Sequence, residues 1–207
     1  MRISEIIALL LTVCNCNIVY CISNTITFSS TRRMVRNLND FGIDSSSFMT
    51  WFSDDKRPME VLNLNPGINK IMKINDSDNK YKGVLNPITF PGISIKSVVT
   101  FDTLFDGKRL EVNCFEDSLV QEYEGSQLLI ALVSNLLPKI KSTNILAISN
   151  DNCLINEATL NIYFTIPKFF PFKKEILEHK GSEAIGKNIE SDLNNLLDKI
   201  IDVYKNT

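Results

Sequence analysis

Hydrophobic residues recur at four- and three-residue steps through the last part of the chain. This spacing predicts one long amphipathic helix that buries its apolar stripe against another element. Gly181 lies in the stripe, and because glycine destabilises a helix, it indicates either a close approach to a sheet or a break in the helix. The stripe consists of Leu177, Gly181, Ile185, Ile189, Leu193, Leu196, Ile200 and Val203.

Upstream of this helix the hydrophobic period changes to two, which predicts antiparallel strands with one wet face. Polar turns at residues 76–79 and at Asp106-Gly107 indicate hairpins. Residues 126–149 are ambiguous between a short helix and a strand, and a strand is favoured from Lys139 to Ser149. The predicted strands are 68–76, 80–87, 92–102, 109–115, 139–149 and 157–167.

Residues 44–65 predict two short helices ahead of the strands. Ser45 can cap the first helix, in which the aromatic residues between positions 48 and 52 fall on one face. Pro58 suits the first turn of the second helix, because proline has no N–H to lose there. The order of elements is therefore that of an α+β chain whose last helix covers one sheet face.

The first 23 residues have the order of a secretory signal peptide. A basic residue, Arg2, precedes an apolar run at 6–13, which is too short to span a bilayer. Small and polar residues follow, so we expect cleavage between Cys21 and Asn24. The alternative, a first apolar helix of the fold, is disfavoured because the run is terminal and a polar gap follows it.

Residues 24–39 are rich in Ser, Thr, Asn and Arg, and the first acid after them is Asp40. Behind a signal peptide, this composition is typical of a transit peptide and predicts a secretory route onward to a plastid-type organelle such as an apicoplast, with secretion as the alternative. The same residues also fit a first strand, and both hold if the strand begins near Arg32. We therefore expect a transit-like leader at 24–31 and a single domain at 32–207.

Composition agrees with one globular domain: 207 residues, 44% of them hydrophobic and 22% charged. The body beyond residue 39 is acidic, which argues against nucleic-acid binding. Three of the five cysteines lie in the leader. The other two, Cys114 and Cys153, can pair in an oxidising compartment, although two ordinary core residues are the favoured interpretation.

No catalytic or metal signature stands out, so we predict no catalytic residue, no metal and no cofactor. His179 is the only histidine and lies between Glu178 and Lys180, a setting typical of a solvated helix face. The carboxylates at 116, 117, 122 and 124 crowd one stretch, where a solvated surface is favoured over an acid–base pair.

The segment 163–177 combines aromatic residues, prolines and lysines at the corner between the last strand and the helix. Its phenylalanines would close the end of a groove between sheet and helix. They either form a sealed corner of the core or line a ligand site, and the sealed corner is favoured because most aromatic clusters are core packing. Its lysines either contact an anionic membrane surface or, as favoured, keep a turn soluble.

Four segments carry a resemblance to a known superfamily: 46–62, 84–102, 160–172 and 179–204. With the order of elements, they resemble the helix-grip fold of the START and birch-pollen-allergen-like (SRPBCC) superfamily, in which a curved antiparallel sheet wraps around a long C-terminal helix. More narrowly, they are similar to an uncharacterised plastid and cyanobacterial family within it, for which no activity is agreed.

The resemblance implies a groove between the sheet and the C-terminal helix that can open into an apolar cavity. We therefore predict non-enzymatic binding of a lipid or other apolar small molecule, with Tyr163, Thr165 or Lys168 as polar contacts. An organelle assembly or interaction factor with a packed core is the alternative. A cyclase- or hydrolase-type enzyme ranks last, because the inward faces are nearly all apolar. The predicted lining consists of Phe164, Ile166, Phe169, Phe170, Phe172, Ile185, Ile189 and Leu193.

Overall fold

The structure is a computed structural model. It describes residues 23–65, 67–74, 79–90, 93–127, 130, 139–167 and 173–207. Within these ranges, eight strands form one antiparallel sheet in the order β1-β8-β7-β6-β5-β3-β2, and β4 pairs with β5 outside this path. The strands are β1 (Ser23–Asn37), β2 (Ile68–Lys73), β3 (Lys80–Leu85), β4 (Ile88–Phe90), β5 (Ile93–Phe105), β6 (Arg109–Gly125), β7 (Lys139–Ile148) and β8 (Cys153–Pro167).

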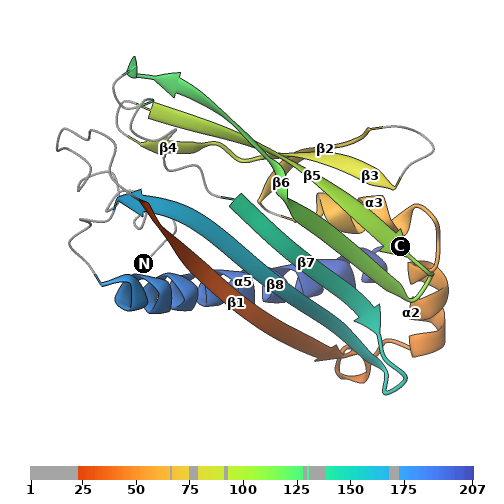
Figure 1. Cartoon of the computed structure of the whole chain (residues 1–207). Helices are drawn as coiled ribbons and strands as arrows, with labels where there is room; N and C mark the ends of the chain where they lie inside the picture. The colour runs from red at the N-terminus through yellow and green to blue at the C-terminus, as the bar shows by residue number, and fades with distance from the viewer. Residues whose placement is uncertain are drawn as a thin grey trace.

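The helices lie at one end of the sheet and along one of its faces. The long helix α5 runs behind β1 and β8, and α2 and α3 lie together at the end of the sheet (Figure 1). This is the helix-grip arrangement, so the predicted fold class is confirmed. The helices are the 3-10 turn η1 (Leu38–Phe41), α2 (Ser45–Phe52), α3 (Arg57–Asn63) and α5 (Lys174–Lys205).

The first strand begins nine residues before the start expected near Arg32. β1 pairs with β8 without a register break, from Ser23 opposite Pro167 to Asn37 opposite Cys153. Residues 24–31, which the composition assigned to a transit-like leader, therefore form half of β1. The alternation of Ser and Thr with apolar residues suits a half-buried edge strand as well as a leader. The pairing with β8 shows the strand, and the leader stays a prediction.

A polar stripe on α5 covers the free edge of β1. The backbone N–H of Thr27 donates to Glu178 Oε1 at 2.8 Å, and that of Ser29 donates to Ser182 Oγ at 2.9 Å. Farther along, Arg36 Nε donates to Asp198 Oδ1 at 2.9 Å. Glu178 and Ser182 are four residues apart, so they share one helix face. They satisfy two of the open backbone N–H groups of this edge strand, which would otherwise invite aggregation.

Two glycines of α5 permit this close contact. A Cβ on Gly181 would collide with the ring of Phe28, and one on Gly186 would collide with the guanidinium of Arg32. Gly181 therefore marks a close approach to the sheet, one of the two alternatives that the sequence left open. α5 continues through it without a break.

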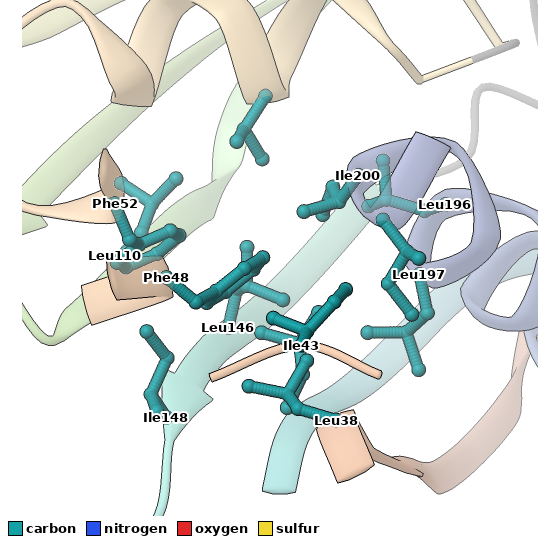
Figure 2. Packing of buried hydrophobic residues seen from close by; sticks show 13 residues of the cluster. Leu38, Ile43, Phe48, Phe52, Leu110, Leu146, Ile148, Leu196, Leu197 and Ile200 are labelled. Atoms are coloured by element: carbon teal, nitrogen blue, oxygen red, sulfur yellow. The ribbon is translucent and has the colours of Figure 1, made fainter. Parts of the chain in front are cut away.

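Buried apolar residues form three clusters. The largest, which we call the sealed end, brings α2, α3 and the last turns of α5 onto the ends of β6, β7 and β8 (Figure 2). The second packs α5 on β1 and β8, and the third packs α3 on β3, β5 and β6. The sealed end consists of Leu38, Ile43, Phe48, Phe52, Val61, Leu110, Leu146, Ile148, Leu154, Leu196, Leu197, Ile200 and Ile201.

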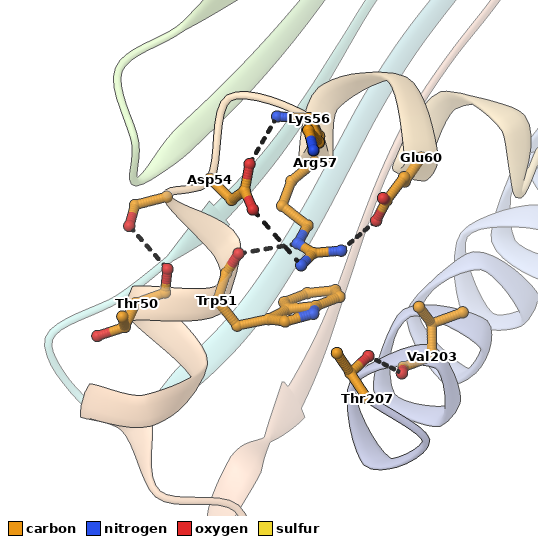
Figure 3. Close-up of polar contacts among 9 residues, drawn as sticks. Thr50, Trp51, Asp54, Lys56, Arg57, Glu60, Val203 and Thr207 are labelled. Carbon is orange, nitrogen blue, oxygen red and sulfur yellow. Dashed lines mark hydrogen bonds and ion pairs between the residues drawn. The ribbon is translucent and has the colours of Figure 1, made fainter.

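Arg57 joins α2 to α3 beside the sealed end. Its Nε donates to the carbonyl of Trp51 at 2.9 Å, its guanidinium lies 4.3 Å from the centroid of the Trp51 ring, and it pairs with Asp54 and Glu60 (Figure 3). The Trp51 ring in turn packs edge-on against Tyr204 of α5, 5.5 Å between centroids. The two short helices are thus attached to the end of the long one.

The caps of the short helices differ in one respect from the prediction. Asp44, not Ser45, is the N-cap of α2, and its carboxylate accepts a hydrogen bond from the N–H of Ser47 at 2.8 Å. Ser45 is the first helical residue, because Asp44 has the extended backbone that a cap requires. Pro58 lies in the first turn of α3, as predicted.

Candidate functional site

The candidate site lies on the face of the sheet that α5 covers, which we call the inner face. Phe164 and Ile162 of β8 lie opposite Ile26 and Phe28 of β1, and all four pack in one cluster with Ile185 of α5. Because side chains alternate along a strand, the even-numbered residues of β8 from Leu154 to Phe164 share this face. Cross-strand register then continues the inner face onto β7 and β6.

On β8 both ends of the inner face are buried, whereas the centre is not. Leu154 and Asn156 are 0% exposed and Ile162 is 6% exposed, but Ala158 and Leu160 between them are partly exposed. On β7 the central residues are also partly exposed, and only the end with Leu146 and Ile148 is buried. We call the partly exposed residues the central window: Val112, Ser142, Asn144, Ala158 and Leu160.

The central window belongs to interior strands, so its exposure is unusual. β6, β7 and β8 each have a neighbour on both sides, and α5 packs on β8 and on the edge strand β1. The apolar window residues Leu160 and Val112 are only partly buried where they pack against the clusters, and so are Ile140 and Ile189 of the second cluster. Solvent therefore reaches the inner face between the three clusters.

The structure brings some of the predicted lining residues together. Phe164, Ile185 and Ile189 meet in the second cluster, where the Phe164 ring lies 5.1 Å from that of Phe28 between centroids. Leu193, Ile185 and Phe164 are 2%, 1% and 5% exposed, so they are core, whereas Ile189 is only partly buried. Ile166 belongs to β8, but its side chain lies outside the described part of the chain, as do Phe169, Phe170 and Phe172.

The predicted polar contacts were wrong where the structure describes them. Tyr163 and Thr165 pair with Thr27 and Thr25 of β1, and they alternate with Phe164. They therefore lie on the outer face of the sheet, away from α5. Lys168 lies outside the described residues.

Asn156 is a polar inner-face residue that the sequence interpretation missed. It is 0% exposed, and neither its Nδ2 nor its Oδ1 has a hydrogen-bond partner among the described residues. Leaving a buried polar group unpaired costs about 1–3 kcal/mol, so such a residue calls for an explanation. The signal was present, because Asn156 continues the even-numbered series of Leu154, Ala158 and Leu160 with a polar side chain.

Asp192 is a polar residue on the facing helix. It follows Ile189 by three residues and precedes Leu196 by four, a spacing that places it on the same helix face as these apolar residues. Its side chain is exposed, although partial desolvation by the surrounding protein raises the pKa of its carboxyl. Asp192 therefore lies at the solvent-exposed margin of this helix face.

Cys114 adjoins the central window and is not set up as a nucleophile. Its Sγ lies 2.8 Å from Ser118 Oγ, and burial raises the pKa of its thiol more than hydrogen bonds with Ser118 and Ser142 lower it. The thiol form, which is a poor nucleophile, is thereby favoured. Cys114 and Cys153 are both free, so the pairing alternative does not hold.

The register explains why these cysteines do not pair. Cys114 lies opposite Ser142, and Ser142 lies opposite Leu160. Leu160 is seven residues along β8 from Cys153, a separation of about 23 Å in a strand. A disulfide requires Cα atoms within about 7 Å.

The other titratable groups singled out in the sequence are at the surface. His179 and the carboxylates of Glu116, Asp117, Glu122 and Glu124 are exposed. Among the described residues, no group of three or more His, Cys, Asp or Glu side chains is placed to hold a metal ion. In the same part of the chain, no helix is both long enough and apolar enough to cross a membrane.

Comparison with solved structures finds distant neighbours of the birch-pollen-allergen type. Truncated norcoclaurine synthase from Thalictrum flavum is 11% identical over 89% of this chain and 97% of that chain, with a TM-score of 0.43. The Zhui aromatase/cyclase from Streptomyces sp. R1128 is 6% identical over 86% and 94%, with a TM-score of 0.45. Ginseng major latex-like protein 151 from Panax ginseng is 10% identical over 86% and 98%, with a TM-score of 0.38.

These similarities carry no argument about what this chain binds, because every one of the three TM-scores is below 0.5. No protein-family model matches the chain, and no curated protein matches it in sequence. The narrower plastid and cyanobacterial family therefore stays a prediction.

Proposed function

We propose that this protein binds a lipid or another apolar small molecule between the central window and α5, without catalysing a reaction on it. The observation that carries the proposal is the partial exposure of the central window on interior strands, which on β8 lies between two buried ends. A sealed core would bury residues such as Ala158 and Leu160 as completely as Leu154.

The chemistry of this region suits an apolar ligand. Its accessible apolar side chains come from the sheet and from the helix, as Leu160 and Ile189 illustrate, so a ligand would be enclosed from both sides. Binding would come mainly from removal of apolar surface from water, worth about 25 cal/mol per Å². Small-molecule sites are typically such apolar recesses with a few polar groups.

Leu160→Trp tests this function by filling the window. The full chain and the variant are incubated with a lipid extract and examined by native mass spectrometry, and binding of the neutral probe N-phenylnaphthylamine is followed by fluorescence. The wild type should carry an apolar adduct and bind the probe, and Leu160→Trp should lose both. Asn161→Trp, on the outer face of the same strand, is the matched control and should bind like the wild type.

A wild-type chain without adduct or probe binding would contradict the proposal. So would a Leu160→Trp variant that folds and still binds both. Because native mass spectrometry weighs the adduct, a positive result also identifies the class of ligand.

An assembly or interaction factor is the second candidate. Leu104, Phe115 and Val120 are 59%, 55% and 60% exposed. Leu104 and Val120 lie on the outer face of β5 and β6, and Phe115 lies where the register between these strands shifts. Exposed apolar residues grouped on one face are a feature of protein-interaction sites. If this function is the correct one, Phe115→Ser with Val120→Ser should abolish co-purification with a protein partner, and Leu160→Trp should not.

For location, we propose entry into the secretory pathway by the N-terminal signal peptide and onward transport to a plastid-type organelle. The composition of the first residues supports the first step, and the acid-poor stretch after it supports the second. Because that stretch also forms half of β1, cleavage after it would remove half of this edge strand from the sheet. A fluorescent tag at the C-terminus of the full chain tests the route, and retention in the secretory pathway or export from the cell would contradict the plastid step.

A further inference from the structure

Asn156 occupies the boundary between the sealed end and the central window. It lies opposite Met34 of β1 and Leu146 of β7, and its next inner-face neighbour along β8 is Ala158 of the window. Asn144, a polar window residue, lies opposite Ala158. It is therefore the diagonal neighbour of Asn156 across the two strands. Asn156 is thus a buried amide at the inner end of an accessible region.

The side chain of Asn156 offers two hydrogen-bonding functions at this boundary. Its Nδ2 can donate and its Oδ1 can accept, and neither finds a partner in the described part of the chain. An apolar residue of the same size, such as leucine, would avoid the cost of burying these atoms. A residue that keeps both functions at the end of a ligand recess is suited to recognising a polar group.

We propose that Asn156 binds the polar end of the ligand, and that this end is an uncharged group able both to donate and to accept a hydrogen bond, such as a hydroxyl or a carboxamide. This inference rests on the proposed function. It places the polar end of the ligand toward the sealed end and its apolar body over the central window, against Leu160 and Ile189.

The uncharged amide of Asn156 suits an uncharged group better than an anion, because it supplies no cation to balance a buried fatty-acid or phosphate head. The inner-face arginines of β1 already have acidic partners. Arg32, opposite Ala158 of the window, lies 3.9 Å from Glu190, and Arg36 bonds Asp198 and Asn194.

The test compares three probes of similar length on the full chain: decanol, undecane and decanoate, each measured by displacement of N-phenylnaphthylamine. The wild type should bind decanol about fivefold more tightly than undecane, the equivalent of one net hydrogen bond, and decanoate more weakly than decanol. Asn156→Leu should lose this preference by weakening decanol binding about fivefold while leaving undecane binding unchanged. Asn161→Leu, on the outer face of the same strand, should keep the wild-type order.

If Asn156 had only a structural role, Asn156→Leu would weaken the binding of all three probes by a similar factor. The ratio of the decanol affinity to the undecane affinity is therefore the decisive readout. If Asn156→Leu does not fold, Asn156→Thr keeps a hydroxyl in a strand-compatible side chain and should retain part of the preference. Probe binding with a preference that survives in Asn156→Leu would overturn this inference and leave the proposed function standing. Absence of any probe binding by the wild type would overturn both.

Discussion

The sealed end and the central window are parts of the same inner face, yet one is core and the other is accessible. Leu154 and Leu160 lie on the same strand, on the same face, six residues apart. Leu154 is 0% exposed under α2 and the last turns of α5, whereas Leu160 keeps solvent contact at the edge of the second cluster. The difference teaches that alternation decides which way a side chain points, but the covering helices decide whether it is buried.

The largest expected effect is a difference between two identical substitutions. Leu154→Ala should destabilise the protein by about 3 kcal/mol, since it leaves a cavity in a closed core. Leu160→Ala should cost less than half of that, because its side chain is already partly hydrated and water can follow the deletion. Urea unfolding of the full-length variants measures both, and equal losses would contradict the existence of the window.

Alanine substitutions at the two glycines of α5 should have effects of intermediate size on stability. Gly181→Ala should destabilise the fold by about 1–2 kcal/mol, because its methyl group meets the buried ring of Phe28, which has no free space to move into. Gly186→Ala meets the flexible end of Arg32, which can shift, and the hydroxyl of the buried Ser30, while it gains helix propensity, so it should cost less than half as much as Gly181→Ala. Thermal unfolding of the two variants measures both costs, and equal losses of stability would refute this account of the helix contact.

The smallest expected effect is a pH dependence at the α2 cap. Hydrogen bonds from Ser46 and Ser47 lower the pKa of Asp44 below its ordinary value of 3.8. A carboxyl group whose pKa is lowered by folding stabilises the folded state above its unfolded pKa, and this contribution is lost as the pH falls through the lowered folded pKa.

Asp44→Asn isolates this contribution, because asparagine also caps helices but does not titrate. The wild type should be slightly more stable than the variant at about pH 5, and the gap should narrow toward about pH 3. Urea midpoints at the two pH values measure it, and a constant gap would show that the Asp44 charge does not stabilise the cap.

The elements were predictable where their hydrophobic period is strong. The stripe of α5, the pairing of β2 with β3 and the strand favoured from Lys139 appear in the structure close to their predicted bounds. The bounds failed where two interpretations share one composition. Residues 24–31 fit a leader and an edge strand equally. Ser and Thr are common on the solvent-exposed face of an edge strand, and they also give a leader its polar composition.

The site was less predictable than the elements. Phe164 and Ile185 were expected to meet and do so, because each belongs to a clear periodic series. Tyr163 and Thr165 were expected as polar contacts, although their odd-numbered positions put them on the outer face. Asn156 carried the better signal, a polar residue within an apolar inner series, but its burial depends on Met34 and Leu146 from other strands.

The sequence alone determined the elements of this protein, their order and the faces that they present, because periodicity and capping act over a few neighbouring residues. It also singled out Gly181, although only the structure chose the close approach to β1 over a break in the helix. Only the tertiary structure decided that residues 24–31 complete β1, that the centre of the inner face stays accessible and that Asn156 is enclosed without a partner. These outcomes depend on which distant elements cover a face, and no local pattern encodes how far a covering helix extends.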